Sequence, residues 1–191
     1  MQLAYNHISI AEYLKFEENS QIRHEYLGGQ IFAMSGGSEE HNRIALNIAS
    51  LLKLHLRGTN CKTFISDMKV KIEIDAKADI FYYPDVMVTC DRQDTEKYYK
   101  NSPCLILEVL SPSTANLDKR EKRLNYQTLT SLQEYVLVSQ DEIKLEIYRK
   151  NNDGNWYAEI LENGDEINLK SVGLTLTMAD IYEDVLPLPN A

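Results

Sequence analysis

The sequence predicts a single mixed α/β domain spanning residues 1–191, and three observations lead to this prediction. First, 191 residues with a hydrophobic content of 43% suffice for one buried core without disulfides or metals to support it. Second, the periodic segments run from helix through several strands to a helix, a strand and a hairpin. Third, no apolar run approaches the roughly 18 residues of a membrane span, and the N-terminus lacks the pattern of a secretory signal. We therefore expect a cytoplasmic protein.

Helices are expected over 9–17, 39–57, 118–129 and 177–184. Ser9 followed by Glu12 has the pattern of a capping box, in which each side chain binds a backbone N–H group of the other residue. Ser38 is placed to cap the longest helix, whose apolar residues recur at helical spacing until an Arg-Gly pair ends it. Thr177 and Asp180 form a capping pair at the start of the last helix.

Strands are expected over 61–66, 68–74, 85–88, 103–110 (ended by Pro112) and 135–139, with hairpins over 25–34 and 143–161. A glycine pair at 28–29 marks the turn of the first hairpin, and the loop 151–155 marks that of the second. Residues 68–74 alternate apolar with charged side chains, which is typical of a strand with one polar face. The apolar runs 85–88 and 103–110 predict strands buried on both faces.

Charge and cysteine content narrow the classes of function. Residues 151–191 hold eight acidic side chains and one basic one, so they carry −7 of the total net charge of −9. Such an acidic chain argues against tight nonspecific binding of nucleic acid, although a local basic face can still provide it. Cys61, Cys90 and Cys104 form no CxxC pair, so we expect free thiols that pack as small hydrophobic groups in a reducing compartment.

Two carboxylates lie in or beside the apolar strands. Glu108 interrupts the run 104–110, where a carboxylate is costly to bury unless it is paired or bound to a cation. A structural salt bridge is the alternative for this residue. Asp85 opens the preceding strand, although a Pro-Asp pair is also common in turns. Two carboxylates at one end of a sheet would supply the hard oxygen ligands that suit Mg²⁺ or Mn²⁺.

The helix that follows the Glu108 strand carries a cluster of charges. Asp118, Lys122 and Tyr126 are spaced four residues apart and share one helix face. The alternative interpretation is a solvated helix with one internal ion pair. Three more basic residues make this run the best candidate for contact with a phosphate backbone: Lys119, Arg120 and Arg123.

Blocks along the chain match a known family in order. They are residues 23–38 followed by His41, residues 83–86, residues 107–114, the trio Asp118, Lys122 and Tyr126, and the pair Glu134 and Tyr135. From about residue 10 to residue 148 the chain resembles the Uma-type restriction endonuclease family, long catalogued as a domain of unknown function. That family is placed in the PD-(D/E)xK nuclease superfamily, and the resemblance implies a restriction-endonuclease-like fold with a central mixed β-sheet flanked by helices.

The resemblance also implies roles for the catalytic residues. Asp85 and Glu108 match the two acidic positions of the superfamily motif and would bind Mg²⁺ or Mn²⁺. The superfamily lysine would fall at position 110, where this chain has Leu110. Lys122, on the following helix, is therefore expected to supply the ammonium group.

Four residues have supporting roles by the same resemblance. Glu25 matches a further acidic position, as a metal ligand, a water-binding group or a partner in a hairpin salt bridge. His41 matches a family histidine, with either a structural or a catalytic role. Asp118 and Tyr126 match the family blocks too, and their spacing from Lys122 leads us to expect that Asp118 helps to hold its ammonium and that Tyr126 shields it or forms a hydrogen bond nearby.

The expected function is metal-assisted hydrolysis of phosphodiester bonds, in DNA by resemblance, although the residues do not exclude RNA. The rival is a catalytically inactive nuclease-fold module that binds nucleic acid or protein. The acidic C-terminal segment and the missing lysine at position 110 favour this rival. A serine hydrolase at Ser111 or Ser113 lacks the GxSxG elbow, and the scattered histidines and cysteines form no zinc cluster. A homodimer is expected because duplex cleavage requires attack on two strands.

Overall fold

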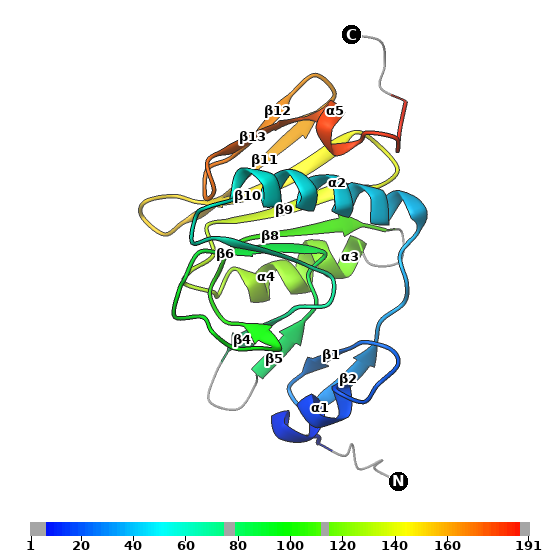
Figure 1. The fold of residues 1–191 in the computed structure, drawn as a ribbon, viewed down its shortest axis with the longest axis vertical. Coiled ribbons are helices and arrows are strands. Elements are labelled where there is room, and N and C mark those ends of the chain that lie inside the picture. Colours follow the sequence, from blue (N-terminus) through cyan, green and yellow to red (C-terminus); the bar gives the residue numbers. More distant parts are fainter. Residues whose placement is uncertain (1–6, 75–78, 112–114, 188–191) are drawn as a thin grey trace.

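The chain is built around a mixed six-stranded sheet (Figure 1). The computed structural model describes residues 7–74, 79–111 and 115–187. Within these ranges the strands of this sheet are, in spatial order, β11 (Trp156–Glu162), β10 (Lys144–Lys150), β9 (Glu134–Ser139), β8 (Pro103–Leu110), β6 (Val86–Thr89) and β3 (Lys62–Ile65). The β8–β9 pair is parallel and the other pairs of adjacent strands in this sheet are antiparallel, so the sheet is mixed as expected.

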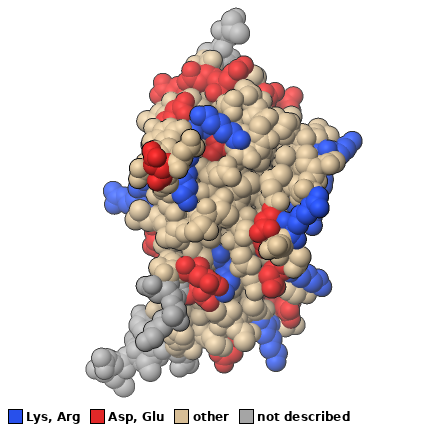
Figure 2. All heavy atoms as spheres, turned by 90° about the vertical axis from the view of Figure 1, so that its left-hand side faces the viewer, with Lys and Arg blue, Asp and Glu red and all other residues tan. Residues whose placement is uncertain are grey.

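A second sheet carries the N-terminal hairpin. Its described strands are, in spatial order, β2 (Gln30–Ala33), β1 (His24–Leu27), β5 (Asp79–Tyr82), β4 (Lys69–Glu73) and β7 (Tyr99–Lys100). A separate hairpin of β12 (Glu166–Leu169) and β13 (Leu174–Thr177) lies at the opposite end of the long axis from α1 (Figure 1). Acidic side chains gather at the end that holds this hairpin, as the sequence implies (Figure 2).

The helices are α1 (Ile10–Glu17), α2 (Glu39–His55), the run α3 (Ala115–Leu117), η1 (Asp118–Lys122) and α4 (Arg123–Tyr126), and α5 (Met178–Ile181). Three of the helices, α1, α2 and α5, begin where their capping residues predict. Ser9 with Glu12, and Thr177 with Asp180, both form complete capping boxes. The π-helical turn η1 interrupts the third helix, which the spacing of its charges did not predict. No helix of the described chain combines the length and apolar composition needed to cross a membrane.

The six-stranded sheet has a hydrophobic core on each face. On one face, α2 packs Ile44, Ile48 and Leu52 against β6 and β8, and the β12–β13 hairpin and α5 extend this core. On the other face, Tyr126 and Tyr82 share a core with side chains of β4, β8 and β9. Burying each such side chain contributes roughly 1.5–3 kcal/mol. The two cores therefore hold α2 and the run α3–α4 on opposite faces of the strand that carries Glu108.

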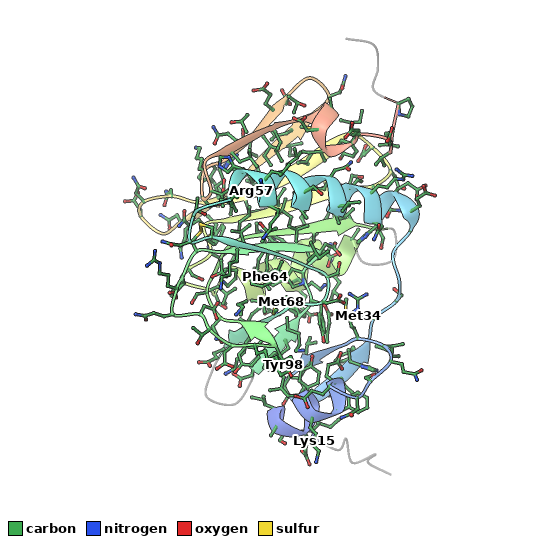
Figure 3. The ribbon with its side chains drawn as sticks, viewed as in Figure 1. Lys15, Met34, Arg57, Phe64, Met68 and Tyr98 are labelled. Carbon is green, nitrogen blue, oxygen red and sulfur yellow. A yellow bond between two sulfur atoms is a disulfide. The ribbon has the colours of Figure 1, made fainter. Side chains whose placement is uncertain are left out.

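Two of the places where the chain crosses between the two large sheets are adjacent. Residues 66–68 lead from β3 to β4, and residues 83–85 lead from β5 to β6. The N–H group of Ser66 donates to the carbonyl oxygen of Asp85 at 3.1 Å, which ties the two crossings together. Phe64 and Met68 lie at the level between the two sheets (Figure 3). Asp85 therefore sits at the junction of the sheets.

Several expectations about the fold need correction. Strands β5 and β7 and the β12–β13 hairpin were not predicted. Lys69 was expected on the polar face of a half-buried strand, but it is buried in β4. The third helix begins at Ala115 and ends at Tyr126, earlier than expected at both ends. Pro112, Ser113 and Thr114 lie outside the described residues.

The expectation of free thiols is wrong for two of the three cysteines. Cys61 and Cys90 form a disulfide. Antiparallel pairing of Lys62 with Thr89 places these cysteines opposite each other just beyond the ends of β3 and β6. Cys104 is a buried free thiol whose Sγ lies 3.7 Å from that of Cys90, and burial raises its pKa to about 11.

Candidate active site at the junction of the two sheets

Asp85 and Glu108 hold each other in place through the backbone. Asp85 directly precedes β6, which pairs with β8 in an antiparallel register that places Val86 opposite Leu107. The N–H group of Asp85 donates to Oε2 of Glu108 at 3.2 Å, and the N–H group of Val109 donates to Oδ2 of Asp85 at 2.8 Å. The two carboxylates thus meet at the same end of neighbouring strands, which is the arrangement expected from the sequence.

His41 approaches Asp85 from α2, on the sheet face opposite to the run α3–α4. Ser38 caps α2 by accepting from the N–H group of His41, which places the imidazole in the first helical turn. Nε2 of His41 lies 3.2 Å from Oδ2 of Asp85. Burial lowers the pKa of His41, but the hydrogen bond to Asp85 and the charges of Asp85 and Asp118 outweigh it and raise the pKa overall. Asp85 thereby favours the imidazolium form of His41.

Lys122 lies among three buried carboxylates. Its Nζ is 2.9 Å from Oε1 of Glu25, 3.4 Å from Oδ1 of Asp118 and 3.6 Å from Oε1 of Glu108. The side chain is 7% exposed, and Nζ also lies 5.3 Å from the centre of the Tyr82 ring. Burial alone would lower the pKa of Lys122, but the three carboxylates raise it well above its ordinary value. Lys122 is therefore held as an ammonium ion beside Glu108.

Local structure explains why these distant residues meet. Glu108 is two positions from both Ile106 and Leu110, so its side chain lies on the same sheet face as theirs. The run α3–α4 covers this face. Both Asp118 and Lys122 lie in the π-helical turn of that run, and both are buried. Such turns are rare and often occur at functional sites. The hairpin β1–β2 adds Glu25 from the second sheet.

Tyr126 supports the carboxylate of Glu108 from one helical turn further on. Its hydroxyl group donates to Oε1 of Glu108 at 2.9 Å, and the ring is completely buried. The carboxyl of Glu108 is itself buried, and this burial together with the charges of Asp85 and Asp118 raises its pKa well above the ordinary value. Lys122 and the Tyr126 hydroxyl oppose that shift without cancelling it. The carboxylates at the site outnumber its cations, Lys122 and His41, and this surplus adds to the effect of burial on Glu108.

A cavity of about 160 Å³ opens onto these groups, and we call it the site cavity. His41, Asp85, Glu108, Asp118 and Lys122 all contribute to its wall. Two other wall residues, Arg23 and Tyr83, were given no role in the sequence analysis. Both lie in the blocks that match the family, 23–38 and 83–86, and this match is the signal that could have indicated them.

The groups around the site cavity fit a divalent cation held by few protein ligands. Oδ1 of Asp85 takes part in no hydrogen bond or ion pair among the described residues, and Glu108 lies beside it. The described residues contain no cluster of three or more histidine, cysteine, aspartate or glutamate side chains placed to hold a metal. Mg²⁺ is commonly bound by one or two carboxylates, with water and substrate phosphate completing its shell. The donor set therefore fits this ion, and Asp85 and Glu108 are the residues that would hold it.

The three basic residues proposed for nucleic-acid contact lie away from the site cavity. Nζ of Lys119 is 2.6 Å from Oε1 of Glu146, and the guanidinium of Arg123 stacks on the ring of Tyr148 at 4.8 Å. Arg120 is exposed. Both partners belong to β10, so Lys119 and Arg123 face a different part of the sheet from Asp85.

Comparison with known proteins gives the same family as the sequence motifs. A model of the Uma2 family, described as "Putative restriction endonuclease", matches residues 10–179. Two relatives from Synechocystis sp. are named only as uncharacterised proteins. The protein slr1290 is 39% identical over 176 residues, which is 92% of this chain and 91% of the relative. The protein sll1609 is 36% identical over 164 residues, which is 84% of this chain and 91% of the relative.

A solved structure shares the fold. The crystal structure of "a putative nuclease belonging to DUF820" from Anabaena variabilis superposes with a TM-score of 0.74 over 94% of this chain and 99% of that one. This superposition supports a common restriction-endonuclease-like fold, and a sequence identity of 18% supports nothing finer. Because the family model covers nearly the whole described chain, the protein belongs to the Uma2 family.

Proposed function

We propose that this protein is a metal-dependent endonuclease that hydrolyses phosphodiester bonds in DNA. The observation that carries the proposal is the meeting of Asp85 and Glu108 at one cavity, with the ammonium of Lys122 3.6 Å from Glu108. Family membership supports the same class of reaction. The surplus of carboxylates over cations at the site favours a bound cation.

Asp85 and Glu108 would hold Mg²⁺ or Mn²⁺. The ion, when bound, supplies positive charge at the scissile phosphate and lowers the pKa of a water molecule. Lys122 is placed to orient that water or to stabilise the negative charge that develops on the phosphate. Glu25 and Asp118 hold the ammonium group in position, and His41 fixes the orientation of the Asp85 carboxylate.

Cleavage of a fluorescent DNA duplex in the presence of Mg²⁺ or Mn²⁺ tests this function. We expect Asp85→Asn and Glu108→Gln to reduce the rate by at least about 100-fold, and EDTA to abolish cleavage. Glu162→Gln is a matched control, because that side chain is exposed on β11, and it should cleave as the wild type does. Undiminished cleavage by Asp85→Asn would contradict the assignment of the site.

A catalytically inactive nuclease-fold module is the second candidate. The observation in its favour is Leu110, which stands where the superfamily motif has its lysine and is buried at the end of β8. For this candidate we expect no cleavage of DNA or RNA with either metal, while binding of nucleic acid or protein persists. For the endonuclease we also propose a two-fold homodimer, which light scattering at micromolar concentration would detect as twice the monomer mass.

A further inference from the structure

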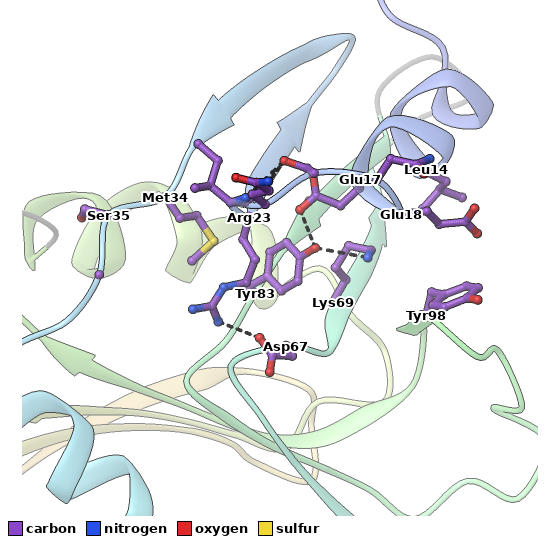
Figure 4. A pocket seen from close by; sticks show the side chains of 15 residues that line it. Leu14, Glu17, Glu18, Arg23, Met34, Ser35, Asp67, Lys69, Tyr83 and Tyr98 are labelled. Carbon is purple, nitrogen blue, oxygen red and sulfur yellow. Dashed lines mark hydrogen bonds and ion pairs between the residues drawn. The ribbon is translucent and has the colours of Figure 1, made fainter.

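A second cavity adjoins the site cavity and has no part in the mechanism described above. It has a volume of about 840 Å³, and we call it the Lys69 pocket (Figure 4). The two cavities share wall residues, among them Arg23 and Tyr83. Tyr83 is two residues from Asp85, a separation of at most about 7 Å along the chain. A chain-like ligand that occupies the site cavity would therefore extend into the Lys69 pocket.

Lys69 is a buried cation in the wall of this pocket. The residue is 6% exposed, and its Nζ donates to the hydroxyl oxygen of Tyr83 at 3.2 Å (Figure 4). Among the described residues, no carboxylate forms an ion pair with Lys69, in contrast to Lys122 with its three. Burial lowers the pKa of Lys69, and the more distant charges of Glu17 and Glu18 only oppose this effect. An ammonium group with unused donors, buried beside an open cavity, is suited to bind an anion.

The acidic groups around the pocket already have partners or face solvent. Oε1 of Glu17 accepts from the hydroxyl group of Tyr83 at 2.8 Å, and Oε2 lies 3.1 Å from Nδ1 of His24. Asp67 pairs with Arg23 at 3.1 Å, and Glu18 is exposed. These carboxylates therefore leave the ammonium of Lys69 without a direct counterion.

Two further residues suit a nucleic-acid strand in this pocket. The guanidinium of Arg23 lies at the border between the two cavities, where its Nη1 donates to the carbonyl oxygen of Ser66 at 2.8 Å and pairs with Asp67. Its Nε and Nη2 groups have no partner among the described residues. Tyr98 lies across the pocket from Met34, and its ring is 47% exposed (Figure 4). Exposed aromatic rings beside a phosphate-binding groove commonly stack on bases.

We propose that Lys69 binds a backbone phosphate of the substrate strand, one or two nucleotides from the phosphate in the site cavity. The proposal rests on the proposed function, because it takes the anion to be part of a nucleic acid. Successive nucleotides of a stacked strand advance about 3.4 Å, which is compatible with the short path from Asp85 to Tyr83. The contact assigns nucleic-acid binding to β4 rather than to the basic residues of η1 and α4.

Binding of a fluorescein-labelled 16-nucleotide DNA strand in EDTA tests the proposal without cleavage. We expect Lys69→Met to weaken binding about tenfold and to lower the slope of log K against log salt by roughly 0.7, the value for one phosphate contact to a single strand. Lys53→Met is the matched control, because Lys53 is exposed on α2, and it should bind with the wild-type slope. An unchanged affinity and slope in Lys69→Met would overturn the proposal.

Two further measurements keep the result interpretable. Lys69→Met should melt no earlier than the wild type, since it removes a buried charge and keeps the length of the side chain. If it does melt early, Lys69→Gln carries the same expectation and the same refutation. Inorganic phosphate should raise the melting temperature of the wild type more than that of the variant. A phosphate effect that depends on Lys69, with strand binding that does not, would refute the substrate strand as the source of the anion.

The outcome also separates this proposal from the proposed function. Strand binding that depends on Lys69, together with no cleavage in Mg²⁺ or Mn²⁺, would reject the endonuclease and retain the phosphate site. Cleavage that depends on Asp85, together with strand binding indifferent to Lys69, would do the reverse.

Discussion

Replacing Lys122 with methionine removes a cation that three buried carboxylates share. Glu25, Asp118 and Glu108 lie 2.9, 3.4 and 3.6 Å from its Nζ, and the lysine side chain is 7% exposed. Breaking one buried pair by removing a partner typically costs about 3–5 kcal/mol, because the other charge stays buried without compensation. One ammonium serves three carboxylates here, so we expect a loss in the upper part of that range at pH 8. A loss of that size is a large fraction of the roughly 5–15 kcal/mol that stabilises a typical domain.

The loss should depend on pH with a definite sign. The pKa of Lys122 is raised in the folded state, so its contribution is complete below the unfolded pKa near 10.5 and is lost only as pH rises through the folded value. From pH 5 to pH 9 Lys122 therefore stays charged, and its own titration adds no pH dependence to the stability. The pKa of Glu108 is also raised, so in this range the folded state holds protons that the unfolded chain has released. Lys122 lowers the pKa of Glu108, so without Lys122 the folded state holds these protons more strongly. The loss of stability in Lys122→Met should therefore shrink steadily as pH falls from 8 toward 5.

Urea denaturation followed by circular dichroism at pH 5, 6, 7 and 8 measures both effects. Lys119→Met is the matched control in the same helical turn, because Lys119 is 40% exposed in its pair with Glu146. Exposed pairs contribute about 0–1 kcal/mol, so the control should stay within 1 kcal/mol of the wild type at every pH. The reasoning fails if Lys122→Met is as mild as this control at pH 8, or if its deficit is the same at all four values.

Three other changes have expected outcomes. Glu108→Gln should raise the melting temperature at pH 8 without metal and remove the decline in stability between pH 4.5 and neutrality, because the raised pKa of Glu108 disfavours its charged form; a melting temperature below that of the wild type would contradict this. Tyr126→Phe should cost about 1–3 kcal/mol in urea denaturation, since it leaves a buried oxygen of Glu108 without its hydroxyl donor; no loss would mean that water replaces the hydroxyl group. Dithiothreitol should lower the stability of the wild type by about 3–4 kcal/mol, because the disulfide of Cys61 and Cys90 spans 29 residues. Cys61→Ser should not respond to the reductant, and equal responses would refute the stabilising role of the disulfide.

The fold was predictable where local chemistry and periodicity agree. Ser9 and Glu12 mark a helix start by their own hydrogen bonds. Strand β8 is buried on both faces, so it is recognisable as a continuous apolar run. Strands β5, β12 and β13 have four residues each, and unlike β3 and β6, which are equally short, they were not recognised from their apolar residues. Lys69 shows a different limit, because alternation separates the two faces of a strand without revealing that both are covered.

The site was predictable to the extent that burying charge is costly. Glu108 drew attention because a carboxylate in an apolar strand requires a partner, and the structure supplies Tyr126, Lys122 and the N–H group of Asp85. The pairing of Glu25 with Lys122 was not predictable from spacing, because the two residues are 97 positions apart and meet only through the second sheet. The catalytic roles of these residues stay predictions until cleavage is measured.

The two adjacent crossings between the sheets determine where this chain tolerates being cut. Ser66, Tyr83 and Asp85 line the site cavity and belong to the segments that join one sheet to the other, so a new terminus at either place would separate the supports of Asp85. The exposed tip at 151–154 follows every residue of the site in the sequence. It joins β10 and β11, which pair along their whole length. A circular permutant opened at this tip should keep the site intact, as would a fusion partner inserted there. Two fragments divided at the tip should likewise reassemble through β10 and β11, which makes this hairpin the natural position for a split version of the protein.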